Sequence, residues 1–252
     1  MHENDLFNVQ GKVVCVTGAS SGLGRHAASV LAKSGAYVVG IARRFEELSN
    51  LQKEVGSNLS VISFDLTQLD RIEKLAGKIS QSFGSPDILI NAAAINTRET
   101  ADDVLKDSWD KTIALNLSAP FFLSKILVKE MKRKKWGRII NIASVQSMRA
   151  FPGGIAYGTT KGGIAQMTRA MAESWSKSGV NANALVPGFV KTELTAEVFN
   201  DTARANRNAA QTCIGRNGKL SDFNGPLIFL SSNASSFMTG QLLTVDGGFT
   251  AK

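Results

Sequence analysis

The sequence predicts an α/β fold, with a doubly wound parallel sheet in a single domain and helices on both faces of the sheet. Short runs rich in β-branched residues alternate with longer helical stretches, which is typical of parallel strands joined by crossover helices. The length of 252 residues suits one domain, and 43% hydrophobic with 20% charged residues is a globular composition. No repeat, low-complexity tract or Pro- or Ser-rich linker divides the chain.

The elements follow from hydrophobic periodicity and from the turn-forming residues between apolar runs. Strands are predicted at 13–17, 37–42, 59–65, 88–91, 138–144, 180–186 and 242–246. Helices are predicted at 23–34, 45–55, 69–83, 106–135, 156–178 and 223–230. The segment 192–220 is polar with irregular periodicity, and we expect it to form a mobile lid over a substrate.

The net charge is +8, and the basic residues gather most densely in one patch beside Trp136, formed by Lys132, Arg133, Lys134, Lys135 and Arg138. Because no RNA- or DNA-binding motif surrounds this patch, we interpret it as a solvated helix end whose cations complement the helix dipole. We expect no nucleic-acid partner.

The sequence also bears on location. No apolar run approaches the roughly 20 residues of a membrane span, and the N-terminus shows no export signal, so we expect a soluble protein without a membrane partner. Cys15 and Cys213 form neither a metal-ligand spacing nor a disulfide framework. Two such unpaired cysteines suit a reducing cytoplasm, and we therefore expect the protein to be cytoplasmic. We expect no metal site.

A glycine-rich turn follows the first predicted strand and opens the first predicted helix. It contains Gly18, Gly22 and Gly24 in a G-x-x-x-G-x-G spacing, with Ser20 and Ser21 between them. Glycines let backbone amides approach an anion, and a helix start presents unpaired N–H groups and a positive dipole. A plain βα turn that happens to be rich in glycine is the alternative. The strand before it and the helix after it favour a site for a dinucleotide pyrophosphate.

The end of the second predicted strand indicates which dinucleotide binds. A carboxylate there would favour NAD, whereas Ala42 is followed by Arg43 and Arg44, whose guanidinium groups can pair with a 2′-phosphate. The alternative is an exposed arginine pair at a helix start, where the dipole makes cations slightly unfavourable. The sequence therefore favours NADP(H). Asp65 and Leu66, after the third strand, could meet the adenine, although Asp65 could equally cap a turn near Thr67.

Four polar residues suggest proton-transfer chemistry. Tyr157 and Lys161 are four apart at the start of a predicted helix and share a face, so the lysine should lower the pKa of the phenol and fit it to exchange a proton with a substrate oxygen. Ser144, at a strand end, could hold that oxygen. Asn116 is polar within an apolar helical segment, which suggests a role such as holding a water molecule. Each residue alone has an ordinary structural explanation, but together, behind a dinucleotide turn, they indicate a catalytic site.

These residues resemble the signatures of the short-chain dehydrogenase/reductase family over essentially the whole chain. The matching motifs are Thr17-Gly-Ala-Ser-Ser-Gly-Leu23-Gly24, Asp87-Ile-Leu-Ile-Asn91-Ala92-Ala93-Ala94, Asn116, Ser144, Tyr157-Gly-Thr-Thr-Lys161, Pro187-Gly188 with Thr192, and Asp246-Gly-Gly248.

The resemblance implies a Rossmann-type fold with Tyr157 as the acid/base. Lys161 would also bind the nicotinamide ribose, Ser144 would orient the substrate oxygen, and Asn116 would support a proton relay. Other residues would contact the cofactor through the turn at 18–24, through Asn91, Ala92 and Ala93, and around the nicotinamide amide through Pro187, Gly188, Val190 and Thr192. The resemblance also implies a homotetramer built through the helices that contain Asn116 and Tyr157.

The chain departs from the family pattern in two places. The usual Asn-Asn-Ala-Gly reads Asn91-Ala-Ala-Ala94, and Thr159-Thr160 replace the common small residues between Tyr157 and Lys161. Because contacts to the cofactor near Ala92 use the backbone, we expect binding to survive the first change.

Within the family, the segments Asp5-Leu-Phe7, Ser144-Val-Gln-Ser147, 187–194 and 245–249 look most like sugar-acid and polyol dehydrogenases, of which gluconate 5-dehydrogenases are the nearest type. Arg98, Arg149 and Lys191 are candidate cations for a substrate carboxylate, and solvated surface charge is an equally good explanation of each. Two alternatives remain open: a 3-oxoacyl-(acyl-carrier-protein) reductase, and a non-catalytic dinucleotide-binding scaffold, which would not need Tyr157 and Lys161.

Overall fold

The computed structural model describes residues 6–252, and Asp5 of the N-terminal segment compared above lies outside these residues. One sheet of seven parallel strands runs through the molecule in the order β3-β2-β1-β4-β5-β6-β7. The order reverses between β1 and β4, since β2 and β3 lie on one side of β1 and the later strands lie on the other. Ligands bind at such a switch point, beyond the carboxyl ends of the strands. The prediction of a doubly wound parallel sheet is confirmed.

The strands are β1 Val13–Thr17, β2 Tyr37–Ala42, β3 Leu59–Ser63, β4 Ile88–Asn91, β5 Gly137–Ile142, β6 Val180–Pro187 and β7 Leu242–Val245. Every predicted strand exists, and the differences lie at the ends. β3 stops at Ser63, before the predicted end at 65, because Asp65 accepts hydrogen bonds from the amide and hydroxyl of Thr67 in a turn. β5 stops before Ser144, whose oxygen accepts the amide of Gln146 and opens a turn.

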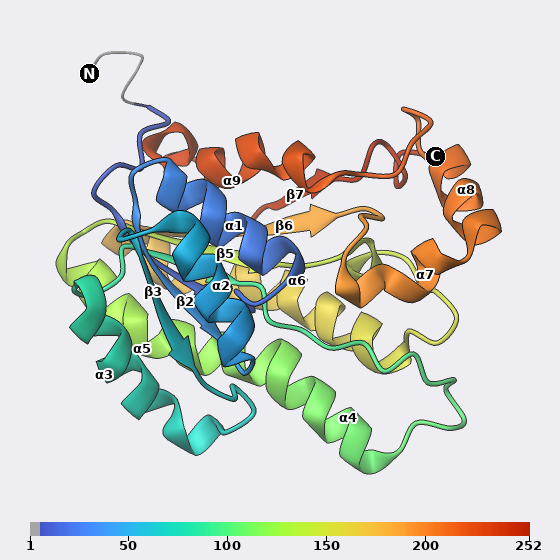
Figure 1. Ribbon diagram of the computed structural model, residues 1–252, viewed down its shortest axis with the longest axis horizontal. Helices are drawn as coiled ribbons and strands as arrows, with labels where there is room; N and C mark the ends of the chain where they lie inside the picture. Colours follow the sequence, from blue (N-terminus) through green and yellow to red (C-terminus); the bar gives the residue numbers. More distant parts are fainter. Residues whose placement is uncertain (1–5) are drawn as a thin grey trace.

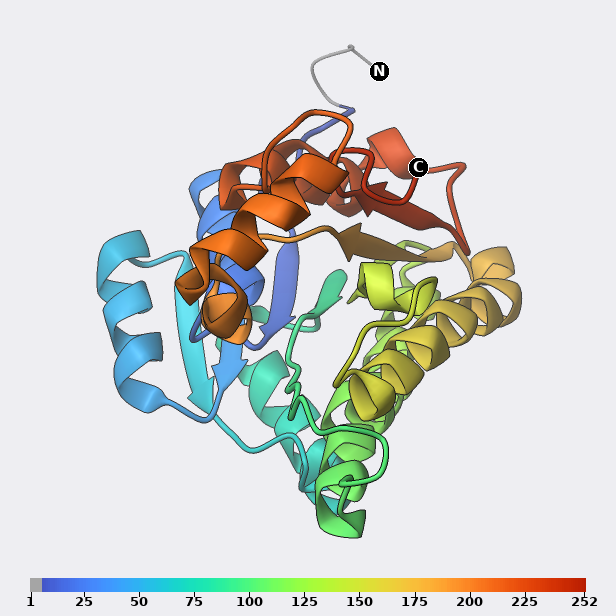
Figure 2. The same ribbon diagram turned by 90° about the vertical axis from the view of Figure 1, so that its right-hand side faces the viewer.

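Helices cover both faces of the sheet (Figures 1 and 2). On one face lie α1 Gly22–Lys33, α2 Phe45–Val55 and α9 Asn224–Ser231, which pack on a core that includes Leu31, Leu51 and Leu227. On the other face lie α3 Ile72–Phe83, α5 Ala119–Arg133 and α6 Ile155–Trp175, around a second core that includes Ile79 and Leu123. The strands β1, β4 and β6 are buried along their whole length, which explains their largely apolar sequences.

The predicted helix at 106–135 is interrupted inside. α4 Lys106–Ile113 passes into a π-helical turn, η3 Ala114–Ser118, and then into α5. One helical stretch, the 28 residues Lys106–Arg133, is long and apolar enough to cross a membrane by length and composition alone. Half of the most apolar window is buried inside the protein, and a core helix passes the same test. The π turn contains Asn116, and such turns occur frequently at functional sites.

The segment 192–220 is more regular than its sequence suggests. It forms a short turn, η6 Glu193–Thr195, and two helices, α7 Ala196–Asn200 and α8 Thr202–Gln211. Asp201 begins α8 by accepting the amide of Arg204, an N-cap that hydrophobic periodicity does not reveal. Both helices lie beyond the carboxyl end of β6, on the right of Figure 1.

The basic patch is only partly the solvated helix end that was expected. Arg138 is 3% exposed, and its guanidinium donates to the carbonyl of Ser232 and stacks over Trp136. Lys134 pairs with Asp87 at 2.7 Å. Cys15 is buried in β1 and Cys213 is exposed, both as free thiols. Within residues 6–252, no three His, Cys, Asp or Glu side chains group closely enough to hold a metal ion.

Candidate active site

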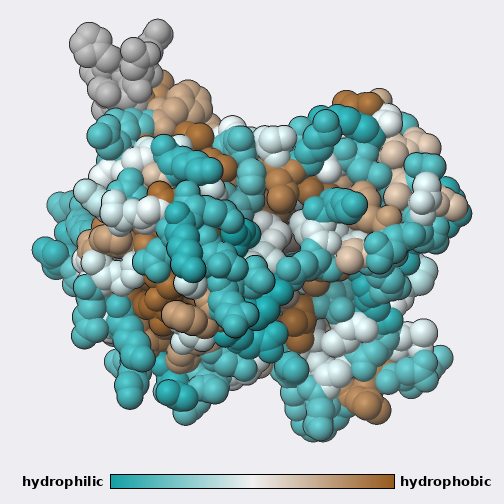
Figure 3. Space-filling view, in the orientation of Figure 1, coloured by the Kyte–Doolittle hydropathy of each residue, from teal (hydrophilic) through white to brown (hydrophobic). Residues whose placement is uncertain are grey.

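A cavity of about 560 Å³ lies at the carboxyl ends of the central strands. The space-filling view shows this side of the molecule hollowed, with hydrophobic side chains inside the hollow and hydrophilic ones around it (Figure 3). Most of the predicted site residues line the cavity: Gly18, Ser20, Ser21, Gly22, Leu23, Gly24, Arg43, Arg44, Asp65, Leu66, Ala92, Ala93, Ser144, Tyr157, Lys161, Pro187, Gly188, Val190 and Thr192. Asn91 and Asn116 do not belong to its lining.

The turn after β1 is built so that only glycine fits. Gly18 has φ +71°, and a Cβ there would lie 2.8 Å from the amide nitrogen of Ala93. A Cβ on Gly24 would lie 2.3 Å from the carbonyl oxygen of Gly18. The side chain of Ser21, at the N-cap of α1, makes no capping bond, and the first helical turn contains no acidic residue. The turn therefore leaves backbone N–H groups and the positive helix end open to an anion.

Thr17 fixes this turn to the end of β4, and the sequence alone did not single it out for this role. Its hydroxyl oxygen accepts the amides of Ala92 at 3.0 Å and Ala93 at 3.2 Å. Asn91 turns into the sheet, where its amide donates to Asn141 on β5 at 2.8 Å and to Ser124 at 3.3 Å. Ala92 and Ala93 thus face the cavity, while Asn91 holds the strands behind it.

The cationic end of the cavity lies after β2. Arg43 and Arg44 both line it, as expected for residues that pair with a phosphate. Arg44 donates to the hydroxyl of Ser20 at 3.2 Å, so one guanidinium connects the end of β2 with the glycine turn. It also pairs with Glu193 at 2.8 Å, and the sequence did not indicate Glu193 as a site residue.

Asp65 caps a turn, as one of the two interpretations expected, and its contact with an adenine stays a prediction. Its carboxylate accepts the amide and hydroxyl of Thr67 and so closes a turn, yet Asp65 and Leu66 also line the cavity. The apolar side chain of Leu66 is 5% exposed beside the cationic end, which suits the face of an adenine ring.

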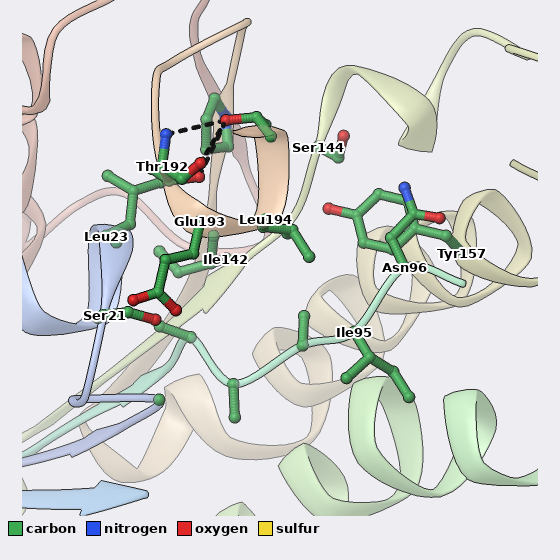
Figure 4. Close-up of a pocket in the computed structure, with 18 of the residues that line it drawn as sticks. Ser21, Leu23, Ile95, Asn96, Ile142, Ser144, Tyr157, Thr192, Glu193 and Leu194 are labelled. Atoms are coloured by element: carbon green, nitrogen blue, oxygen red, sulfur yellow. Dashed lines mark hydrogen bonds between the residues drawn. The ribbon is translucent and has the colours of Figure 1, made fainter. Parts of the chain in front are cut away.

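The phenol of Tyr157 points into the cavity near the hydroxyl of Ser144 (Figure 4). Tyr157 is 8% exposed at the start of α6, and Ser144 follows β5. Thr160 donates to the carbonyl of Tyr157 at 2.7 Å, so the replacement at this position fits within the helix. The two hydroxyls come from different elements and face the same space.

The structure does not show the expected lowering of the Tyr157 pKa by Lys161. Burial raises the pKa of Tyr157 to about 12, and a hydrogen bond with Ser144 and the charge of Arg98 only partly oppose it. The Lys161 Nζ donates to the carbonyl of Ile142 at 2.6 Å, so it is directed toward the end of β5. Burial lowers the pKa of Lys161 itself to about 8. The prediction of a lowered phenol pKa from helical spacing alone was therefore wrong.

Asn116 acts on the cavity through its neighbours. Its Oδ1 accepts the amide of Ile95 at 2.9 Å, and its Nδ2 donates to the carbonyl of the same residue at 2.8 Å. A further contact of 3.2 Å reaches the hydroxyl of Thr160 on α6. Asn116 thus ties the loop after β4 to the helix that presents Tyr157, and its part in a proton relay stays a prediction.

Residues after β6 form the opposite wall. A Cβ on Gly188 would lie 2.7 Å from the Cα of Asp246, so the chain passes close to the end of β7. The Thr195 hydroxyl accepts the amide of Thr192 at 2.9 Å and contacts its hydroxyl at 3.1 Å, as the dashed lines in Figure 4 show. This turn carries Thr192 and Glu193 over the glycine turn.

Among the three candidate cations for a substrate carboxylate, the cavity contains Arg98. Its guanidinium donates to the carbonyl of Leu194 at 2.7 Å and pairs with Glu197 at 3.0 Å. Arg149 donates to the carbonyl of Phe249 and stacks over its ring, outside the cavity lining. Lys191 does not line the cavity either.

Comparisons with known proteins agree with this geometry. A family model described as enoyl-(acyl carrier protein) reductase matches residues 18–250. The chain is similar to gluconate 5-dehydrogenase of Gluconobacter oxydans (strain 621H), at 38% identity over 253 residues and 99% of each chain. It is also similar to 3-oxoacyl-(acyl-carrier-protein) reductase of Vibrio cholerae, at 34% identity over 242 residues, 96% of this chain and 98% of the relative.

The crystal structure of a gluconate 5-dehydrogenase from Burkholderia cenocepacia J2315, in complex with NADP and tartrate, superposes with a TM-score of 0.93. The two are 32% identical, and the match covers 100% of both chains.

Proposed function

Because the chain belongs to the short-chain dehydrogenase/reductase family, we propose that it is an NADP(H)-dependent dehydrogenase that interconverts a hydroxyl and a keto group on a sugar acid. The observation that carries this proposal is the position of Arg98, in the same cavity as Ser144 and Tyr157. A guanidinium beside a proton-transferring phenol suits a small substrate with a carboxylate at one end. The similarity to gluconate 5-dehydrogenases supports the same substrate class.

The residues of the cavity fit the cofactor. The glycine turn and the start of α1 would hold the pyrophosphate, and Arg43 and Arg44 would hold the 2′-phosphate. Leu66, Ala92 and Ala93 would line the adenosine side, and the segment 187–192 the nicotinamide side. When bound, the nicotinamide supplies or accepts the hydride.

The protein itself handles the proton. In the direction of reduction, Tyr157 donates its phenolic proton to the substrate oxygen as the carbonyl carbon gains the hydride, and the Ser144 hydroxyl holds that oxygen by a hydrogen bond. In oxidation the same groups act in reverse. Lys161 holds the start of α6 against β5 through the Ile142 carbonyl, and Asn116 positions α6 and the loop after β4.

We also propose that the whole chain is one catalytic domain, with 192–220 as its substrate lid, and that it works as a cytoplasmic homotetramer. Arg98 supports the lid assignment, because it connects the cavity wall with Leu194 and Glu197. Exposed apolar side chains on α5, Phe121 and Phe122, support an interface between copies along this helix. Light scattering of the purified protein tests the assembly.

The experiment that tests the function is oxidation of gluconate with NADP⁺, and reduction of 5-ketogluconate with NADPH, followed by the absorbance of the reduced nicotinamide. Turnover of these sugar acids above that of an acetoacetyl thioester supports the proposal. The reverse preference would favour the second candidate, a 3-oxoacyl-(acyl-carrier-protein) reductase, which the similarity to the Vibrio cholerae enzyme supports. Failure of both substrates to react, with cofactor still bound, would favour a non-catalytic scaffold.

A further inference from the structure

Two carboxylates of the segment after β6 pair with arginines of the cavity. Glu193 pairs with Arg44 at 2.8 Å, and Glu197 pairs with Arg98 at 3.0 Å. Arg44 lies at the cofactor end and Arg98 at the substrate end. The proposed lid therefore pairs a carboxylate with each of the two arginines that we propose to bind the cofactor and the substrate.

Glu193 lies within reach of the anion-binding groups of the glycine turn. Figure 4 shows its carboxylate directed toward Ser21, and its pKa is lowered by the hydrogen bond and charge of Arg44 and by the hydroxyl of Ser21. Arg44 also contacts the hydroxyl of Ser20. A carboxylate that contacts Arg44 and Ser21 makes contacts of the kind that a phosphate group would make there.

We infer that Glu193 limits the preference of this enzyme for NADP(H), because it competes with the 2′-phosphate for Arg44. NADH has a hydroxyl at that position, so the ion pair between Arg44 and Glu193 can persist when NADH binds. A 2′-phosphate must draw Arg44 away from Glu193, or accept a carboxylate close to its own negative charge. This inference rests on the proposed NADP(H)-dependent function and adds a residue that limits the preference for the phosphorylated cofactor.

The exposure of the two side chains sets the size of the expected change in NADPH binding. The side chains of Arg44 and Glu193 are 47% and 60% exposed, so solvent screens the pair strongly. Removal of the carboxylate charge should therefore change the binding of NADPH by about three- to tenfold, a magnitude of the order of one exposed ion pair together with repulsion of a phosphate.

The test is the dissociation constant of NADPH and of NADH, measured by nicotinamide fluorescence for the wild type and for Glu193→Gln, which keeps the shape and removes the charge. We expect the ratio of the NADH to the NADPH dissociation constant to rise about three- to tenfold in the variant, because only NADPH carries the 2′-phosphate that competes with Glu193 for Arg44. The control is Glu197→Gln, which removes an equal charge from the same lid but from the partner of Arg98. It should leave the ratio of the two constants unchanged.

A second variant pair tests the route through Arg44. In an Arg44→Ala background the effect of Glu193→Gln should shrink, because Arg44 holds the carboxylate over the glycine turn. Weaker NADPH binding in Glu193→Gln, or an equal change for both cofactors, would overturn the inference while leaving the proposed function intact. A wild-type protein that bound neither cofactor would instead contradict the proposed function, and the inference with it.

Discussion

The Nζ of Lys161 lies 5.4 Å from the centre of the Tyr157 ring, one turn along the same helix. Its hydrogen bond nevertheless goes to the carbonyl of Ile142, and burial raises the phenol pKa to about 12. The phenol therefore keeps its proton at neutral pH. Tyr157 is prepared to donate a proton to a carbonyl oxygen in the direction of reduction.

This protonation state predicts the pH dependence of the oxidation. Oxidation of an alcohol needs the phenolate, and below a raised pKa the phenolate fraction grows about tenfold for each pH unit. The kcat/KM for gluconate with NADP⁺ should therefore rise steadily between about pH 6 and pH 9, whereas reduction should lose no activity toward neutral pH. Initial rates in both directions across this range check the prediction. An oxidation rate independent of pH would show that Tyr157 is not the base.

Replacement of the phenol tests its role directly. Tyr157→Phe keeps the buried ring but removes the proton route, so turnover should fall by several orders of magnitude. NADPH binding should remain, because the turn at 18–24 and the two arginines are unchanged. Single-turnover kinetics and cofactor fluorescence separate these effects. Ser144→Ala is a useful comparison, since it leaves the phenol in place and should cost less than the tyrosine change.

The sequence predicted the sheet and the location of the site because both depend on local patterns. Continuous apolar runs mark strands that are buried on both faces, and the glycines of the turn are required by close approaches between neighbouring segments, such as Gly24 against Gly18. The ends of β3 and β5 were misplaced because side-chain hydrogen bonds at Asp65 and Ser144, rather than hydrophobicity, end these strands.

The features of the site that the sequence did not predict depend on contacts between residues far apart in the chain. The hydrogen bond between Thr17 and Ala92 joins residues 75 positions apart in the sequence, and that between Arg98 and the Leu194 carbonyl joins residues 96 apart. No local spacing in the sequence therefore indicates either contact. Glu193 was missed for the same reason, although its position directly after Thr192 was a signal. The pKa of Tyr157 depends on burial and on the direction of the Lys161 ammonium, and spacing on a helix determines neither.

The two arginines after β2 predict the cofactor preference. Changing both Arg43 and Arg44 to alanine should weaken NADPH binding by about tenfold or more for each charge-assisted hydrogen bond to the 2′-phosphate that is removed, which corresponds to about 1.5–3 kcal/mol each. NADH should be affected little, since it has no 2′-phosphate. Dissociation constants of both cofactors measure the change. An unaltered ratio of the NADPH and NADH dissociation constants would show that the 2′-phosphate binds elsewhere. The single Arg44→Ala variant shows how much of the effect is due to Arg44, which pairs with Glu193.

Arg98 predicts which substrates the cavity accepts. It has an unusual positive φ of 57°, and its guanidinium is held between the Leu194 carbonyl and Glu197 while it faces the same cavity as Tyr157. Arg98→Met keeps much of the side-chain length and removes the charge. The kcat/KM for gluconate should then fall by about 10- to 100-fold, as expected for one hydrogen-bonded charge pair. Oxidation of glucitol, a neutral polyol of the same length, should change by less than about threefold.

Release of the proposed lid could lower activity without any role of Arg98 in substrate binding, and Glu197→Gln separates the two effects. This variant breaks the ion pair with Arg98 and keeps the guanidinium, so the lid is freed from the same ion pair while the cation for the substrate remains. If Arg98 binds the carboxylate of gluconate, Glu197→Gln should preserve the preference for gluconate over glucitol. The Arg98 guanidinium is still present in this variant and no longer pairs with Glu197. Equal reductions on both substrates in Arg98→Met would show that Arg98 only holds the lid.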